Sequence, residues 1–273
     1  MNNLAAVRME VPEVFDVAHQ LVLRLVGEGK VTGLRIDHPD GLYAPVEYFK
    51  RLQEGAVLST ARRLVPDLGP SDLEALAAHY RAQVAANPAA AAARPLWIVA
   101  EKILVPGEPL PEWWVVAGTT GYDFLGSVNG LLVDRGTSRR MAAIYRRFAG
   151  ARAGMADETY AAKRLIMQVS MASEINQLGD RLDRISERNR LFRDFTLPSL
   201  ARALREVIAA FPVYRTYVGE DGGEPSARDR AYIEHAVASA ERRNPTVNVS
   251  VFDFVRDALL LRYPAAADAE ERA

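Results

Sequence analysis

Two short stretches of the sequence carry charged side chains directly at the ends of apolar runs that are typical of buried strands. In VTGLRIDHPDGL, Arg35 and Asp37 lie two residues apart and precede a His-Pro-Asp-Gly turn. In LWIVAEK, Glu101 and Lys102 follow the apolar run. Charged groups at the end of a buried strand are costly unless they are paired or used, so these positions are the first candidates for chemistry.

The two carboxyl groups could share the work of glycosyl transfer. Arg35 and Asp37 fall on the same face of a strand, and the guanidinium should hold Asp37 ionised, as a nucleophile requires. Glu101 is expected behind an apolar stem, where its carboxyl could stay protonated near neutrality and act as an acid. One charged and one protonatable carboxyl about 5–5.5 Å apart is the arrangement of retaining glycosidases. An Arg-x-Asp pair is also common as a structural ion pair, and the pattern alone leaves that alternative open.

The elements that position these residues alternate between helix and strand. The periodicity predicts helices at 13–28 and 48–63, and strands at 31–37 and 96–100. A capping box formed by Ser71 and Glu74 predicts a further helix that ends near residue 86. Helix followed by strand, twice over, indicates parallel strands joined by crossover helices, which is an α/β fold. The carboxyl ends of such strands are where α/β barrels build active sites.

The second half of the chain is expected to be nearly all helix. An apolar stripe in one of these helices comprises Met171, Ile175, Leu178, Leu182 and Ile185. Thr196 should begin another helix that runs to about residue 210, and helices are predicted at 227–243 and 249–262. The alternating run FPVYRTYV predicts a strand at 211–218. We therefore divide the chain into segments 1–135, 136–210 (a helical subdomain) and 211–273 (a strand and closing helices).

Composition narrows the class of protein. The chain has 273 residues, of which 49% are apolar and 25% charged, and its formal net charge is −1. This charge gives no reason to expect a nucleic-acid or membrane partner. The absence of Cys and the scattering of the 4 His residues argue against thiol chemistry and a metal site. No apolar run is long enough to span a membrane and no signal peptide is evident, so we expect a cytoplasmic protein.

Three longer stretches make the sequence resemble a known family. GLRIDHPDGLYAPVEYFKRL, WIVAEKILVPGEPLPEWWVVAGTTGYDFLGSVNGLLVD and FPVYRTYV resemble maltooligosyltrehalose synthases of the α-amylase clan. The resemblance implies a partial TIM-type (β/α) barrel in residues 1–135, with about 56–94 as a helical insertion, in a chain that is helix-dominated overall. It also implies an intramolecular transglucosylation that converts the reducing-end α-1,4 linkage of a maltooligosaccharide to an α,α-1,1 linkage, without cofactors.

The resemblance assigns roles to individual residues. Asp37 would be the nucleophile, Glu101 the general acid/base, and Arg35 the group that orients Asp37. The other expected substrate contacts are His38, Lys102, Tyr122 and Asp123. Trp113 and Trp114 could offer flat surfaces to sugar rings, although packing under a loop explains them equally well. The Gly-punctuated GTTGYDF loop could help to wall in the released glucose.

Two strand-end motifs of the clan are not found in this sequence. One is the first motif, and the other carries the third catalytic carboxylate, which no residue here matches. We therefore expect this chain to be inactive alone, and its partial barrel to expose surface that could promote self-association. The alternatives are a glycan-binding or assembly module without catalysis, and a hydrolase of the same clan.

Overall fold

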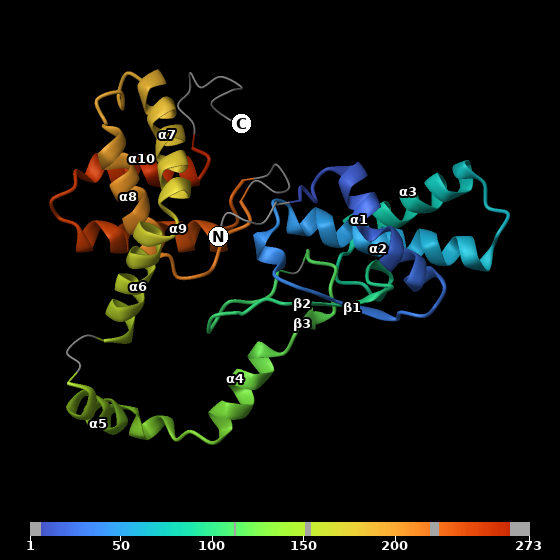
Figure 1. The fold of residues 1–273 in the computed structure, drawn as a ribbon, viewed down its shortest axis with the longest axis horizontal. Coiled ribbons are helices and arrows are strands. Elements are labelled where there is room, and N and C mark those ends of the chain that lie inside the picture. Colours follow the sequence, from blue (N-terminus) through green and yellow to red (C-terminus); the bar gives the residue numbers. More distant parts are fainter. Residues whose placement is uncertain (1–6, 112, 151–153, 219–223, 263–273) are drawn as a thin grey trace. The chain divides into compact units, whose positions relative to one another are not determined.

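The computed structural model describes residues 7–111, 113–150, 154–218 and 224–262 (Figure 1). Contacts divide the chain into two compact units, Met1–Val133 and Asp134–Ala273. The first unit contains a small sheet covered by helices, whereas the described residues of the second unit contain only helices. The predictions of parallel strands and of a helix-dominated chain are confirmed.

The sheet of unit 1 has three parallel strands in the order β1-β2-β3. These are β1 (Gly33–Ile36), β2 (Trp97–Ala100) and β3 (Gly118–Thr119). Arg35 is in register with Val99, and Ile36 with Ala100, so the carboxyl ends of β1 and β2 lie side by side. Three strands are fewer than the eight that close a TIM barrel, so within the described residues the structure shows a parallel α/β sheet and no barrel.

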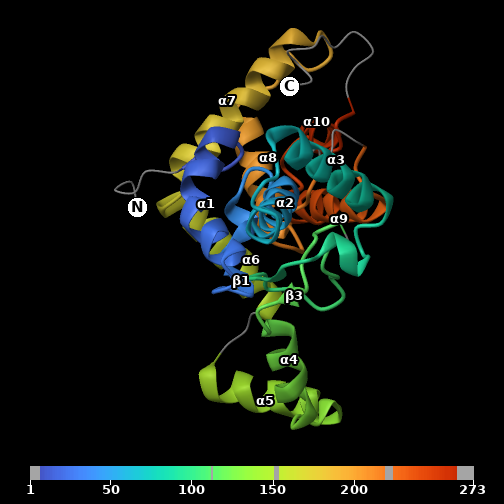
Figure 2. The same cartoon turned by 90° about the vertical axis from the view of Figure 1, so that its right-hand side faces the viewer.

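The helices of unit 1 are α1 (Pro12–Gly27), α2 (Pro45–Leu64), α3 (Pro70–Ala86) and α4 (Tyr122–Leu131), with 3₁₀ turns at Pro39–Gly41 and Ala91–Ala93. Helices α1 and α2 lie side by side in both views (Figures 1 and 2). Two glycines permit this close packing. A Cβ on Gly27 would lie 2.8 Å from the Ser59 carbonyl oxygen, and one on Gly55 would lie 2.7 Å from Leu23.

The core of unit 1 joins α2 to the sheet. Phe49 of α2 is buried against Trp114, with ring centroids 5.0 Å apart. Gln53, also buried, donates hydrogen bonds to the carbonyl oxygens of Leu96 (2.9 Å) and Val115 (2.7 Å) and accepts one from the Leu96 N–H (2.9 Å). One side chain thus satisfies backbone groups on both sides of β2, because a buried amide group must find partners.

Unit 2 is built from α5 (Ser138–Ala149), α6 (Met155–Val169), α7 (Ala172–Arg188), α8 (Leu197–Ala210), α9 (Ala227–Arg243) and α10 (Val249–Leu259), with a 3₁₀ turn at Arg135–Thr137. Its core lies among α8, α9 and α10, where Leu200, Ile233 and Phe252 are almost completely buried. In the predicted stripe of α7, Ile175 is buried and Leu182 and Ile185 pack on neighbouring side chains, but Leu178 is exposed.

Two sequence predictions about local structure are wrong. Helix α3 begins at Pro70 with Gly69 as its N-cap, and Asp72, not Glu74, accepts the capping hydrogen bond from the Gly69 N–H (3.0 Å). Proline suits the first helical position, so Ser71 falls inside the helix. Residues 211–218 form no strand. A strand needs a neighbour for its backbone groups, and among the described residues unit 2 offers none.

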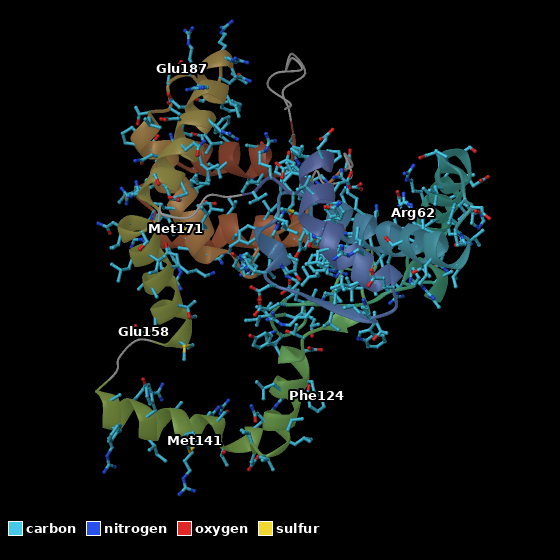
Figure 3. The ribbon with its side chains drawn as sticks, turned by 45° about the vertical axis from the view of Figure 1, so that its right-hand side comes forward. Arg62, Phe124, Met141, Glu158, Met171 and Glu187 are labelled. Atoms are coloured by element: carbon cyan, nitrogen blue, oxygen red, sulfur yellow. The ribbon has the colours of Figure 1, made fainter. Side chains whose placement is uncertain are left out.

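Helices α4 and α5 carry exposed apolar side chains. Phe124 of α4 and Met141 of α5 point away from their own helices (Figure 3). Self-association through such residues stays a prediction. No helix in the described part of the chain combines the length and apolar character needed to cross a membrane.

Candidate active site

The candidate site lies where β1 and β2 end. The Glu101 N–H donates a hydrogen bond to the Ile36 carbonyl oxygen (2.8 Å), which continues the strand pairing by one residue. This bond places Glu101 beside the residues that follow β1, and it explains how residues 64 positions apart in the sequence come together. The expectation that both carboxyl groups lie at strand ends is therefore met by the sheet register.

Arg35 joins the two carboxyl groups. Its guanidinium contacts Asp37 Oδ1 at 2.8 Å and Glu101 Oε1 at 3.1 Å. A hydrogen bond from the Glu101 carboxyl, and then the hydrogen bond from Arg35, hold the pKa of Asp37 below its usual range. Both bonds stabilise the ionised form, which is the form that attacks as a nucleophile. The predicted direction for Asp37 is thus found, although Glu101 contributes more to it than Arg35.

The surroundings of Glu101 are more polar than the sequence suggested. Its Oε2 accepts a hydrogen bond from the His38 backbone N–H (3.1 Å), and its Oε1 accepts one from the Tyr122 hydroxyl (3.5 Å). The expected apolar stem holds for the strand but not for the carboxyl group itself, because the turn after β1 and the start of α4 bring polar groups to it.

His38 has an unusual backbone conformation that aims its N–H at Glu101. Its φ of 42° lies in the left-handed region, which non-glycine residues seldom adopt. Gly41 makes room for the ring, because a Cβ at that position would lie 2.6 Å from His38 Cδ2. The tight turn predicted for His-Pro-Asp-Gly is present as the 3₁₀ turn Pro39–Gly41.

Tyr122 and Asp123 lie at the start of α4 but make different contacts. Tyr122 reaches Glu101, as described above, whereas Asp123 accepts a hydrogen bond from the Thr119 hydroxyl, and this bond lowers the pKa of Asp123. Gly121 precedes both in the left-handed conformation, with φ 105°, so the Gly-punctuated loop acts as the turn from β3 into α4. The structure therefore brings Tyr122 to the carboxyl pair and ties Asp123 to β3.

Lys102 does not face the site. Its side chain is completely buried, and its Nζ contacts Asp40 Oδ2 (3.0 Å) and Glu108 Oε1 (3.1 Å). The prediction that Lys102 contacts substrate conflicts with this burial. Side chains alternate along an extended chain, so Lys102 points to the opposite side from its neighbour Glu101. Lys102 instead ties the turn after β1 to the loop after β2. The sequence reasoning missed Asp40 and Glu108, although both follow a candidate residue within a few positions.

The two tryptophans differ. Trp114 is buried against Phe49 and belongs to the core, so packing explains it. Trp113 remains partly exposed. Within the described part of the chain, no group of three or more His, Asp or Glu side chains could hold a metal ion.

Several known proteins are similar to this chain over part of their length. No family model matches the sequence. A putative maltooligosyl trehalose synthase of Mycobacterium tuberculosis is 35% identical over 134 residues, which are 49% of this chain and 13% of that protein. The solved maltooligosyltrehalose synthase of Arthrobacter ramosus is 31% identical, with a TM-score of 0.69 over 95% of this chain.

The chain is similar to a segment of maltooligosyltrehalose synthases. It spans 27% of the Arthrobacter ramosus structure. A solved glycosyltrehalose synthase is 25% identical with a TM-score of 0.53, and this chain covers 26% of it. The resemblance stated from the sequence is therefore confirmed. The alignments cover between 13% and 27% of these relatives, so the activity of a complete maltooligosyltrehalose synthase passes to this chain only as a proposal.

Proposed function

We propose that this chain supplies the nucleophile and the general acid/base of a maltooligosyltrehalose synthase. The observation that carries the proposal is the single guanidinium, that of Arg35, in contact with both Asp37 and Glu101 at adjacent strand ends. Retaining enzymes need their two carboxyl groups about 5–5.5 Å apart, and one guanidinium in contact with both keeps this pair close together. The finer fold that goes with this proposal is a (β/α) barrel to which the three strands contribute.

The proposed reaction has two steps. Asp37 attacks the anomeric carbon of the penultimate glucosyl unit, while Glu101 protonates the departing O4 of the reducing-end glucose. Glu101 then takes the proton from the anomeric hydroxyl of that glucose, which attacks the glycosyl-enzyme and frees Asp37. Arg35 holds Asp37 in place throughout. Tyr122 and the His38 turn would contact the sugar beside Glu101.

Transfer to the released glucose requires that water be kept out. The Asp37 side chain is 72% exposed, so the described residues leave it open to solvent. We propose that turnover needs the further segments that longer relatives carry, and that the protein acts in the cytoplasm on maltooligosaccharides. The same exposure favours the second candidate, a hydrolase, because water would compete with glucose for the intermediate.

Incubation of the purified chain with maltohexaose distinguishes a synthase segment from a hydrolase. We expect binding by calorimetry without any change in reducing ends or product mass. Loss of reducing ends at unchanged mass, abolished by Asp37→Ala, would mean that the chain carries the whole activity and needs no further segments. Reducing ends that rise with time would establish hydrolysis. Absence of both binding and turnover in a folded chain would contradict the proposed function.

A further inference from the structure

A groove runs between α2 and α3, outside the Asp37–Glu101 site. Its volume is about 410 Å³, which is within the usual range of about 300–1,000 Å³ for small-molecule sites. Helix α2 lines it with Glu47, Lys50, Arg51 and Glu54, whose spacing puts them on one face of the helix. Helix α3 lines the other side, with Arg81 among its residues, and Trp113 contributes an aromatic ring.

Trp113 does not pack in the core. It is 37% exposed, whereas the adjacent Trp114 is 2% exposed and packs on Phe49. A partly exposed indole that lines a groove presents a flat apolar face together with one N–H donor. Such a face suits a ligand that is apolar on one side and polar at its edge.

Four of the five charged groups of the groove are paired with one another. Arg81 holds Glu54 with two contacts of 2.8 Å each, and Arg51 contacts Glu47 at 3.1 Å. The pairs are therefore electrically compensated and fixed in geometry, yet they keep spare donor and acceptor positions. Lys50 is the remaining charge, and no ion pair to it occurs among the described residues. A neutral ligand with many hydroxyl groups matches this lining better than an anion does.

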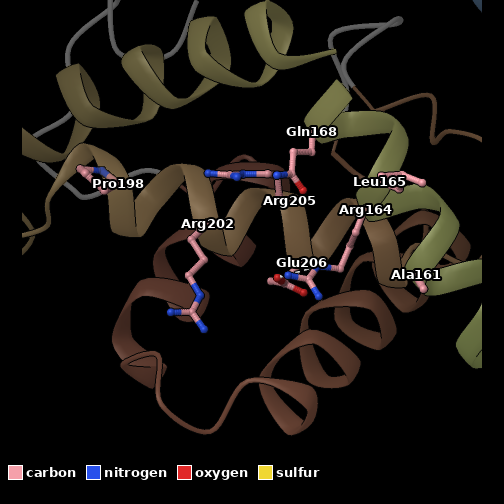
Figure 4. A pocket seen from close by; sticks show the side chains of 8 residues that line it. All are labelled: Ala161, Arg164, Leu165, Gln168, Pro198, Arg202, Arg205 and Glu206. Atoms are coloured by element: carbon pink, nitrogen blue, oxygen red, sulfur yellow. Dashed lines mark ion pairs between the residues drawn. The ribbon is translucent and has the colours of Figure 1, made fainter. Parts of the chain in front are cut away.

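A cavity in unit 2 shows the contrast. It lies between α6 and α8, has a volume of about 470 Å³, and is lined by Arg164, Arg202 and Arg205 (Figure 4). Among the described residues that line it, Glu206 forms an ion pair with Arg164, at 3.1 Å. In Figure 4, Arg202 and Arg205 extend in different directions from α8, so they do not converge on one ligand. Excess charge marks this cavity, whereas paired charge and an aromatic ring mark the groove between α2 and α3.

We propose that the groove between α2 and α3 binds a glucosyl unit of an α-glucan as a second sugar site. The indole of Trp113 lies against the apolar face of the sugar ring, and the Glu54–Arg81 and Glu47–Arg51 pairs bond to its hydroxyl groups. The choice of an α-glucan rests on the proposed function. The groove would hold a maltooligosaccharide on the protein without taking part in the bond exchange.

The test follows each tryptophan separately. The full chain, labelled with 5-fluorotryptophan, should give three ¹⁹F resonances, because it contains 3 Trp. Titration with maltohexaose should shift the Trp113 resonance and leave those of Trp97 and the buried Trp114 in place. In calorimetry Trp113→Ala should weaken maltohexaose binding by about tenfold. The matched control is Trp97→Ala, which removes an exposed indole from outside the groove and should change nothing.

Other results would overturn the proposal. A Trp113 resonance that stays fixed at saturating maltohexaose, or that responds equally to the β-linked cellohexaose, excludes an α-glucan site. A shift on addition of inorganic phosphate alone would assign the groove to an anion held by Lys50. If Trp113→Ala fails to fold, Trp113→Phe keeps an apolar ring at this position. It should bind maltohexaose more weakly than the unaltered chain, by less than about tenfold. The carboxyl ¹³C resonance of Asp37 is read in parallel, so that a shifted Trp113 with an unchanged Asp37 at saturating maltohexaose refutes only the proposed function.

Discussion

The two units bury polar groups to very different ends. In unit 1, Lys102 is buried with Asp40 and Glu108. Gln53 is buried as well, and it is hydrogen-bonded to the backbone of Leu96 and Val115. In unit 2 the cluster among α8, α9 and α10 consists of apolar side chains, and the buried Glu206 and Asp229 contact the partly exposed Arg164 and the helix cap Ser226. Buried polar groups cost free energy unless each finds partners, but they fix geometry more sharply than apolar packing does. In unit 1 the buried polar groups connect the strands to the loops beside the candidate site.

The buried ion-pair cluster gives the largest expected effect. Lys102→Met leaves the Asp40 and Glu108 carboxylates buried without their cation, and should lower the free energy of unfolding of unit 1 by about 3–5 kcal/mol. All three tryptophans lie in unit 1, so urea unfolding followed by Trp fluorescence reports it directly.

The control for this cluster is Lys30→Met. Lys30 contacts Glu28 at 2.7 Å, but both side chains are exposed, so the expected change is below about 1 kcal/mol. Similar losses for the two variants would mean that burial of Lys102 has no special role.

The apolar core of unit 2 should respond to a cavity instead. Leu200 is fully buried, and Leu200→Ala should lower the free energy of unfolding by about 3 kcal/mol, as measured by circular dichroism. Leu191→Ala removes the same atoms from an exposed position and should be nearly silent. A silent Leu200→Ala would show that this core does not stabilise unit 2.

A smaller loss is expected from the buried amide of unit 1. Gln53→Leu keeps the volume but strands the Leu96 and Val115 backbone groups, which should cost about 2 kcal/mol. Gln20→Leu, on the exposed side of α1, is the control. Full stability in Gln53→Leu would show that water or a rearranged backbone satisfies those groups, and that the contrast between the units is weaker than described.

The exposed ion pair should matter for titration more than for stability. Arg35→Gln removes one of the three groups that lower the pKa of Asp37, so that pKa should rise toward its ordinary value of about 3.9, measured by carboxyl ¹³C NMR. Because the folded-state pKa lies below the unfolded value, ionised Asp37 favours folding above about pH 3.9. This contribution is lost as pH falls through the folded-state pKa. An unchanged Asp37 pKa in Arg35→Gln would leave Glu101 and His38 as the groups that lower it.

Sequence reasoning found what depends on local pattern. The helix start at Thr196, the parallel pairing of β1 and β2, and the carboxyl pair at their ends follow from capping, periodicity and alternation. It failed where the outcome depends on tertiary contacts that local pattern does not reveal. The alternating run at 211–218 has no strand beside it, and Lys102 is buried because Asp40 and Glu108 surround it. Neither fact is written in the residues themselves.

Asp37 and Glu101 are the two residues that we propose to perform glycosyl transfer. The most direct measurement replaces the matched segment of the Arthrobacter ramosus enzyme with this chain and follows reducing ends and product mass with maltohexaose. The chimera should consume the reducing ends of maltohexaose without a change in product mass. Asp37→Asn or Glu101→Gln in the chimera should slow this reaction by at least about 10³-fold. A folded chimera that retains its activity with Asp37→Asn, or that never consumes reducing ends, would contradict the claim.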